Sequence, residues 1–487
     1  MRYLLALIAG AVNVACFSPF EWWFLLLPSF VIVFFLWQNA RPGQSFWIGF
    51  SFGIGQFGLG VSWVYISIQT FGGMPPVLAA VCVAAFVFIL SLFPALAGWL
   101  QSRFNRYGFV SRVVVITPVC FVLFEWLRGW IFTGFPWLTT GYALLQTPLS
   151  GLAPVGGVYL LSFVALTSIG TIMALIRDIN KRTIFVALFV AGLWGSAWVM
   201  DQFLWSTPSG QPVSVAIIQN NVPLLEKWQP QQRQAIIFEY IEKSQRHKDK
   251  DLIVWPEGAI PDYLENLSDA FWQFLEQHPS DFAFGSLHQP EPGGDYFNSV
   301  VAAGEGLEIY NKQHLVPFGE FFPMQSLLAP VLKYLTIPMA DFSPWNQHQL
   351  PLPLAGHLAA VSVCYEDAFP GEWRNQVPTA GLLLNVSEDM WFGNSLAPHQ
   401  RLQMAQFRSR ESERPMVRSS NNGLSSLIDW RGTVTAVAPQ FKKAVVEGEI
   451  QPRQGVTPYI RFGDLPALIL MLVMLMPSLL FGRRALR

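Results

Sequence analysis

Two kinds of hydrophobic pattern follow one another along this chain. From residue 1 to about residue 200, apolar residues form long runs separated by short loops, and one more run lies near the C-terminus. A run of about 20 apolar residues is long enough to cross a bilayer as a helix. Eight such runs occur, at about 2–18, 20–38, 45–69, 76–100, 111–133, 155–176, 183–201 and 464–482. One alone could be a buried core helix, but together they predict an α-helical membrane bundle of eight spans.

Between residues 213 and 455 the pattern is that of a water-soluble domain. Short apolar stretches rich in β-branched residues predict strands at 213–222, 251–257, 281–287, 298–304, 357–366 and 381–387. Longer polar stretches at 229–248 and 396–412 predict amphipathic helices. Strands that alternate with helices and are buried on both faces indicate an α/β domain. We therefore expect seven membrane helices in residues 1–201, an α/β domain at 213–455 and a last membrane helix at 464–482.

Charge sets the expected orientation. Hydrophobic residues make up 52% of the chain and charged residues 13%, and the net charge of −1 with no basic patch gives no sign of nucleic-acid binding. The loops 71–76 and 134–154 contain no Lys or Arg. The basic residues lie near the two termini and near every second loop, so all of them fall on the same side of the membrane. They are Arg2, Arg41, Arg103, Arg106, Arg112, Arg177, Lys181, Arg182, Arg483, Arg484 and Arg487. Because basic loops stay in the cytoplasm, both termini are predicted to be cytoplasmic and residues 202–463 to lie outside.

Three features of the apolar segments have specific interpretations. Residues 49–60 are dense in glycine, which allows helices to pack closely in lipid. Glu125 and Arg128 lie one helical turn apart in the fifth span, either as a functional site or as a structural ion pair. Residues 321–335 are too apolar for an ordinary exposed loop. They fit a helix that covers the core and equally an arm that dips into the membrane.

Cysteine placement directs attention to one strand end. Three of the four cysteines, Cys16, Cys82 and Cys120, lie in predicted membrane helices. Cys364 alone lies in the α/β domain, at the end of a strand and directly before Tyr365, Glu366 and Asp367. Taken by itself, a buried core cysteine is the commoner case.

Two other strand ends favour a catalytic interpretation. Glu257 ends the apolar strand 251–257, where it loses hydration beside Trp255, a setting that suits a general base. Lys312 lies in a loop with Gly, Pro and aromatic residues. A thiol is only slightly ionised at about pH 7 and needs a base or a cation. Glu257 can accept the proton of Cys364, while Lys312 and the backbone N–H after the nucleophile can hold an oxyanion.

These motifs resemble a known family in order and spacing. Glu257 in "WPEGA", Lys312 in "YNKQHLVPFGEFFP" and Cys364 in "VSVCYED" resemble the Glu-Lys-Cys triad of the nitrilase superfamily. The membrane spans around that domain are similar to those of the bacterial apolipoprotein N-acyltransferases. Further similar segments are "QNNVPLLEKW", "MWFGNSLAPHQ" and "RSSNNGLSS", whereas "NVSEDMWFG" and "GAIPDY" follow the family pattern only loosely.

The resemblance implies a fold and a reaction. The fold would be a nitrilase-like four-layer αββα sandwich on a membrane bundle. The enzyme would lie in the bacterial inner membrane with a periplasmic catalytic domain. We expect a monomer, because nothing in the sequence suggests a second copy. It would move an acyl chain from a phospholipid, typically phosphatidylethanolamine, through a thioester on Cys364, to the α-amino group of a diacylglyceryl-cysteine at a lipoprotein N-terminus. Glu320, Tyr365 and Glu366 would support the triad, and Trp228 would lie on a mobile arm at the site entrance.

Other interpretations remain open at this point. Trp391 in "MWFG" fits either a core position or a wall for the acyl chain. A membrane-tethered amidase or hydrolase would use the same triad with water as the acceptor. A transporter or receptor with a sensing ectodomain would need polar or broken helices and no triad. No metal or cofactor is predicted, because the sequence has no H-E-x-x-H or C-x-x-C motif and no convincing glycine-rich phosphate loop.

Overall fold

The computed structural model describes residues 1–321 and 341–481, and it divides into two compact units. The helical unit contains residues 1–65, 76–204 and the chain from 461 onward. The sheet unit contains residues 66–75 and 205–460. Most of the apolar segment expected at 321–335 and the last residue of the run expected at 464–482 lie outside the described residues.

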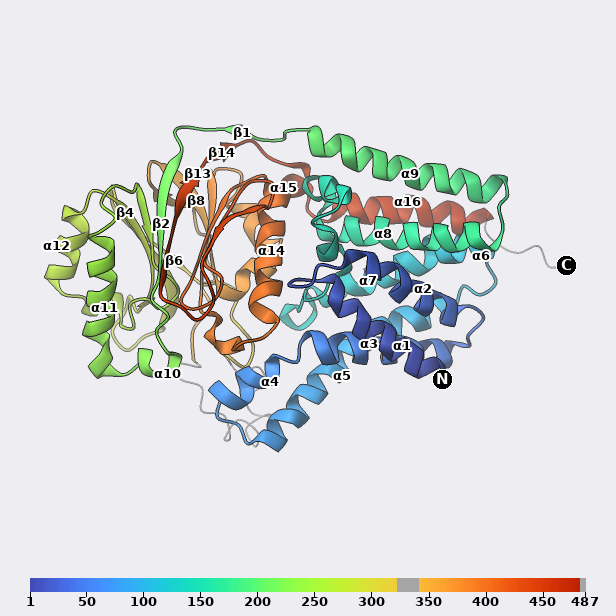
Figure 1. The fold of residues 1–487 in the computed structure, drawn as a ribbon, viewed down its shortest axis with the longest axis horizontal. Coiled ribbons are helices and arrows are strands. Elements are labelled where there is room, and N and C mark those ends of the chain that lie inside the picture. The colour runs from blue at the N-terminus through green and yellow to red at the C-terminus, as the bar shows by residue number, and fades with distance from the viewer. Residues whose placement is uncertain (322–340, 482–487) are drawn as a thin grey trace. The chain divides into compact units, whose positions relative to one another are not determined.

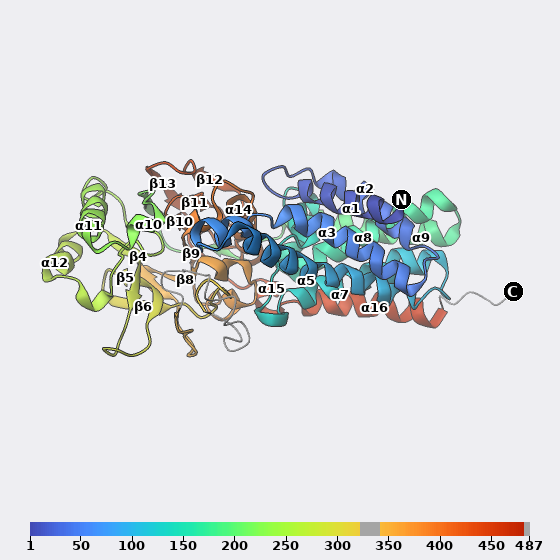
Figure 2. The same ribbon diagram turned by 90° about the horizontal axis from the view of Figure 1, so that it is seen from below.

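The helical unit is a bundle of apolar helices (Figures 1 and 2). Helix α3 packs against α1 and α5, and α16 packs against α8. The long helices are α1 (Arg2–Asn13), α2 (Leu26–Trp37), α3 (Pro42–Gly60), α5 (Pro76–Ser102), α7 (Thr117–Arg128), α8 (Ala153–Arg177), α9 (Lys181–Gln202) and α16 (Leu465–Phe481).

Each predicted apolar run contains a helix, but the helices differ in length. Four are long and apolar enough to cross a membrane, at Pro76–Ser102, Phe109–Arg128, Pro148–Arg177 and Lys181–Gln202. The run expected as a single span at 45–69 is bent by 59° between Pro42–Gly60 and Val64–Phe71, and would be a fifth span if the two parts are counted together. Residues 66–75 of this segment belong to the sheet unit. Arg2–Cys16, Trp23–Trp37 and Leu465–Leu480 are shorter apolar helices.

Glycine allows the close helix packing expected for residues 49–60. A Cβ atom at Gly49 would lie 2.2 Å from the carbonyl oxygen of Pro94 in α5. A Cβ atom at Gly55 would lie 2.0 Å from the carbonyl oxygen of Leu7 in α1. Only glycine lets these backbones approach so closely, which is the packing mode of helices in lipid.

Two six-stranded mixed sheets form the centre of the sheet unit. The first has the order β13-β2-β3-β4-β5-β6 and the second the order β12-β11-β10-β9-β8-β7. Strands β2, β3 and β4 run parallel, as do β8, β9 and β10, and the remaining neighbours pair antiparallel. The first sheet contains β2 (Val213–Gln219), β3 (Leu252–Val254), β4 (Asp281–His288), β5 (Phe297–Ala303), β6 (Leu307–Asn311) and β13 (Ala444–Ile450). The second contains β7 (Leu352–Leu354), β8 (His357–Val363), β9 (Leu382–Ser387), β10 (Met416–Ser420), β11 (Ser426–Ile428) and β12 (Val434–Val437).

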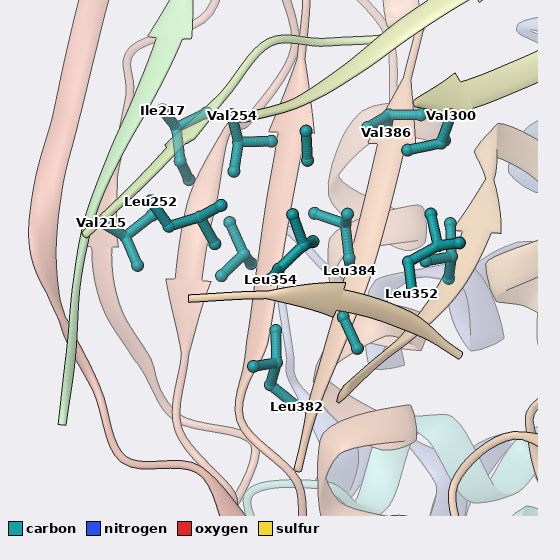
Figure 3. Close-up of a cluster of buried hydrophobic side chains, with 14 of the residues drawn as sticks. Val215, Ile217, Leu252, Val254, Val300, Leu352, Leu354, Leu382, Leu384 and Val386 are labelled. Atoms are coloured by element: carbon teal, nitrogen blue, oxygen red, sulfur yellow. The ribbon is translucent and has the colours of Figure 1, made fainter. Parts of the chain in front are cut away.

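Apolar side chains of the two sheets meet in a common core. Figure 3 shows Val215 and Leu252 from the first sheet near Leu354 and Leu382 from the second. The other face of the first sheet packs against α11 (Pro230–Ser244) and α12 (Asp269–Gln277) through a second cluster that includes Trp255. The other face of the second sheet packs against α14 (Ala397–Ser412) (Figure 1).

All six predicted strands and both predicted helices of this domain are present. Strands β6, β7 and β10 to β13 were not predicted, because several are short or carry polar residues. One expectation was wrong: α14 is not amphipathic, since 14 of its residues are buried, including Arg401, Arg408 and Arg410. Some of its polar side chains have buried partners, as Arg401 has in Asp389 and Arg408 in Glu411.

Candidate active site

Three functional side chains follow strands of the two sheets. Glu257 lies three residues after β3, and Lys312 directly follows β6 in the same sheet. Cys364 directly follows β8 in the second sheet and begins a 3₁₀ turn, Cys364–Ala368. Strands β3 and β8 are apolar and largely buried, whereas the first residues of β6 are exposed. All three side chains follow the ends of their strands, where α/β domains usually place their chemistry.

Cys364 has a strained backbone. Its φ of +51° is in the left-handed region, where a residue with a Cβ atom is uncommon. Such strain costs about 1–3 kcal/mol and is concentrated at functional sites. The side chain is 8% exposed, so Cys364 lies just beneath the surface of the site. A cysteine that only filled the core would need no such turn.

The charges around Cys364 keep its thiol protonated at rest. Burial raises the pKa of the Cys364 thiol to about 12, and the Glu257 carboxylate adds to the increase. Arg401 and Lys312 lower this pKa in part, and Asp389 raises it. A preformed thiolate is therefore disfavoured, and a thiol in this setting would act as a nucleophile only if a nearby base took its proton during attack.

A hydrogen-bond chain links Glu257 to Lys312 through Asn298 and Glu320. Asn298 Nδ2 donates to Glu257 Oε1 at 2.7 Å and to Glu320 Oε1 at 3.1 Å. Lys312 Nζ lies 2.8 Å from Glu320 Oε2 and donates to Oε1 at 2.9 Å. Glu257 Oε2 is buried and has no hydrogen-bond partner in the described part of the chain. One carboxylate oxygen is therefore anchored, while the other is available to accept a proton.

Lys312 is a buried, permanent cation. Its side chain is 1% exposed, and burial alone would lower its pKa. The Glu320 carboxylate, together with Cys364 and Glu257, raises the Lys312 pKa above its ordinary value. The ammonium group is thus suited to stabilise negative charge and not to exchange protons.

Glu366 joins the Lys312 loop to the Cys364 turn. Its Oε1 accepts from the backbone N–H groups of Gln313 at 2.7 Å and His314 at 3.0 Å. Its Oε2 accepts from Val363 N at 2.7 Å. Burial raises the pKa of Glu366 to about 8. Tyr365 points elsewhere, and its ring packs edge-on against His314 and Phe369.

The two predicted tryptophans lie on separate segments. Trp228 follows the short helix α10 (Leu224–Lys227) and is half-buried. A Cβ atom at Gly258, next to Glu257, would lie 3.5 Å from the Trp228 ring, so this ring borders the Glu257 loop. The carbonyl oxygen of Trp391 accepts from Ser67 Oγ at 2.8 Å, and its ring packs edge-on against Phe71.

Several buried polar residues at the site were not predicted. Asn298 lies within β5, where a polar residue gives no pattern signal. Lys227 Nζ donates to the Glu257 carbonyl oxygen at 2.9 Å and pairs with Glu388 at 2.5 Å. Arg401 lies within α14, and its Nη1 is 3.6 Å from Cys364 Sγ. The unusual density of arginine and glutamine in α14 was the available signal, because such a helix lacks an apolar stripe.

No group of three or more His, Cys, Asp or Glu residues that could hold a metal ion is found in residues 1–321 and 341–481.

Two family models match the chain, one over the apolar N-terminal part and one over the α/β domain. The model described as "Apolipoprotein N-acyltransferase N-terminal domain" matches residues 9–171, and the model described as "Carbon-nitrogen hydrolase" matches residues 214–459. An apolipoprotein N-acyltransferase from Methylococcus capsulatus is 39% identical over 96% of this chain and 93% of its own length. Proteins with the same name from Pseudomonas putida and Photobacterium profundum are 37% and 36% identical, each over 99% of this chain and over 97% and 95% of their own lengths.

The chain belongs to the apolipoprotein N-acyltransferase family. Membership confirms the resemblance inferred from the motifs, and with it the prediction of an acyltransferase that carries a nitrilase-like domain. The apolar helices fit the inner-membrane location expected for this family.

Proposed function

We propose that this protein transfers an acyl chain from a membrane phospholipid to the α-amino group of the diacylglyceryl-cysteine at a lipoprotein N-terminus. The observation that carries the proposal is the convergence of a thiol, a carboxylate and a buried ammonium group, in a chain related over its whole length to apolipoprotein N-acyltransferases. Phosphatidylethanolamine is the proposed donor. The reaction is a ping-pong route through a thioester on Cys364.

In the first half-reaction, Cys364 attacks the ester carbonyl of the phospholipid. Glu257 takes the thiol proton through its unpaired Oε2 as the S–C bond forms. Lys312 and the backbone N–H of Tyr365 stabilise the tetrahedral oxyanion. When the ester C–O bond breaks, Glu257 returns the proton to the departing alkoxide, and lysophospholipid leaves behind an acyl-enzyme.

In the second half-reaction, the free amine of the lipoprotein attacks the thioester. Glu257 accepts a proton from the amine as the C–N bond forms, and Lys312 again faces the oxyanion. The C–S bond then breaks, and the Cys364 thiolate recovers the proton from Glu257. The same base thus serves both halves, and the cysteine is regenerated as a thiol.

The remaining site residues have supporting roles. Glu320 fixes the Lys312 ammonium group, and Glu366 holds the Lys312 loop against the Cys364 turn. Tyr365 contributes its backbone N–H to the oxyanion. Trp228 and Trp391, on segments that border the site, act as lids or walls for the lipid substrates.

We further propose a monomer with eight membrane spans and both termini in the cytoplasm. Support comes from the eight apolar runs and from basic residues on alternate loops. Residues 1–201 and 464–482 would hold the protein in the inner membrane, and residues 213–455 would form a four-layer αββα sandwich in the periplasm. The acyl donor and the lipoprotein would both reach the site from the outer leaflet. Alkaline phosphatase fused within the loop 71–76 is expected to be active, and fused after residue 178 inactive.

Intact mass spectrometry of the purified protein incubated with phosphatidylethanolamine tests the reaction, with Cys364→Ala as the control. We expect the mass of one acyl chain to be added, to be removed by hydroxylamine and to be missing from the variant. Addition of a diacylglyceryl-peptide with a free α-amine should then discharge the adduct onto the peptide. An N-acetylated peptide should leave the adduct in place.

Two results would contradict the proposal. If active, folded protein never carries the adduct, Cys364 is not the nucleophile. If the adduct discharges equally fast to free fatty acid without the peptide, the protein is a hydrolase of the nitrilase type.

A further inference from the structure

Arg401 of α14 lies against the nucleophile. Its Nη1 is 3.6 Å from Cys364 Sγ, and its Nη2 donates to the Cys364 carbonyl oxygen at 2.7 Å. The Arg401 side chain is completely buried. It therefore contacts both the reacting atom of Cys364 and the strained backbone that carries it.

Two buried carboxylates hold the Arg401 guanidinium group in this position. Asp389 Oδ1 lies 2.5 Å from Nη1, and Asp367 Oδ2 lies 3.0 Å from Nη2. A second arginine, Arg418, pairs with Asp389 at 3.2 Å and lies 3.8 Å from Asp367. Two cations and two anions thus balance, and burial of such an ion cluster is tolerated only when its members are paired.

The cluster presents one of its members to the sulfur. In the described contacts, Arg418 makes no hydrogen bond to Cys364, whereas Arg401 directs an N–H group at Sγ. A charge-assisted donor near a sulfur favours its ionised form. The guanidinium group stays protonated throughout, so it can hold negative charge without competing for the proton that Glu257 takes.

We propose that Arg401 is a second catalytic cation, which stabilises negative charge on the Cys364 sulfur each time the thiolate forms or leaves. The proposal rests on the proposed role of Cys364 as the nucleophile. It divides the electrostatic task between two cations. Lys312 faces the oxyanion on the substrate, and Arg401, on helix α14, faces the sulfur of Cys364.

The step requires no new reactant. As the S–C bond forms, the thiol proton goes to Glu257, and Arg401 stabilises the charge that develops on sulfur before the bond is complete. As the C–S bond breaks in the second half-reaction, the electron pair returns to sulfur beside the same N–H group. Loss of Arg401 should therefore slow both half-reactions.

Alkylation of Cys364 by iodoacetamide tests the effect on the sulfur without any lipid substrate. The charged groups that face the thiol are Glu257, Lys312, Asp389 and Arg401, and only the last is changed. An opposite charge within hydrogen-bond reach shifts a pKa by about one unit or more. We therefore expect Arg401→Gln to label about tenfold more slowly than wild type across the range from about pH 7 to 9.

Arg418→Gln is the matched control, because it removes the other cation of the same cluster and leaves the sulfur contact intact. It should label close to the wild-type rate, although its unfolding temperature falls as far as that of Arg401→Gln. Arg401→Lys retains the charge without the planar fork and should recover part of the rate. If Arg401→Gln does not fold, Arg401→Gln with Asp367→Asn leaves fewer unpaired charges and should show the same slowing.

The proposal would be overturned if Arg401→Gln were labelled at the wild-type rate, or if Arg418→Gln were slowed as much as Arg401→Gln. Arg401 would then have a structural role only. The test is separable from that of the function. If labelling depends on Arg401 but wild-type protein forms no acyl adduct, the proposed acyl transfer fails and the effect of Arg401 on the sulfur stands.

Discussion

Asn298 is the residue whose replacement most directly tests the geometry of the base. Its single Nδ2 group bonds Glu257 Oε1 at 2.7 Å and Glu320 Oε1 at 3.1 Å, and Asn298 is itself buried. In Asn298→Ala, Glu257 Oε1 loses this donor, while Oε2 has no partner to replace it among the described contacts. The carboxylate proposed to take the Cys364 proton would then be free to rotate.

The expected loss follows from the strength of one such bond. A hydrogen bond to a charged group contributes about 1.5–3 kcal/mol. If that contribution is needed to hold Glu257 in the transition state, the rate of acyl-enzyme formation falls about 10- to 150-fold. Asn298→Asp should lose more, because it places a third carboxylate against Glu257 and Glu320.

The assay is single-turnover formation of the acyl-enzyme from phosphatidylethanolamine in lipid nanodiscs, followed by intact mass spectrometry. Ser299→Ala is the matched control on the same strand. It removes a buried bond from Ser299 Oγ to Asn311 Oδ1 at 2.7 Å that does not touch Glu257 or Glu320. Unfolding temperatures measured by tryptophan fluorescence separate loss of structure from loss of rate.

The reasoning would be refuted by a folded Asn298→Ala that acylates at the wild-type rate. It would be refuted equally if Ser299→Ala lost as much activity, since the effect would then arise from the strand and not from the base.

Three further outcomes are expected. Gly285→Ala should strongly reduce acyl-enzyme formation, because its Cβ would lie 2.6 Å from Glu257 Cα, whereas Gly306→Ala, with open space around it, should have little effect. The rate of iodoacetamide labelling of wild-type Cys364 should keep rising with pH up to about 12, the raised pKa of the folded thiol. Between the ordinary thiol pKa of 9.0 and this value, the thiol of the unfolded chain ionises first, so the free energy of unfolding should fall over the same pH range. Labelling that levels off near the ordinary pKa would contradict this. Glu366→Gln places an NH₂ group against backbone N–H donors and should destabilise the sheet unit by about 1–3 kcal/mol in thermal unfolding; an unchanged unfolding temperature would show that those donors find other acceptors.

Several features were predictable from the sequence because they depend on local pattern. The apolar runs and the strands that precede Glu257 and Cys364 are recognisable, since burial of both faces demands continuous apolar residues. Where a helix bends was not predictable. The run at 45–69 has no charged residue, yet Ser67 near its end hydrogen-bonds the Trp391 carbonyl oxygen in the sheet unit. Hydropathy records how apolar a residue is and not which partner it contacts.

The sequence by itself determined which residues could carry out the chemistry: a thiol and an acid, each placed after an apolar strand, and an amine in a loop. Only the tertiary structure decided how they act. It gave Cys364 its left-handed backbone and buried thiol, anchored one oxygen of Glu257 on Asn298, and brought Arg401 to the sulfur from a helix without an apolar stripe. The physical reason is that hydrogen bonds and charge pairs join residues far apart in the chain, and their strength depends on distances and burial that no local pattern contains.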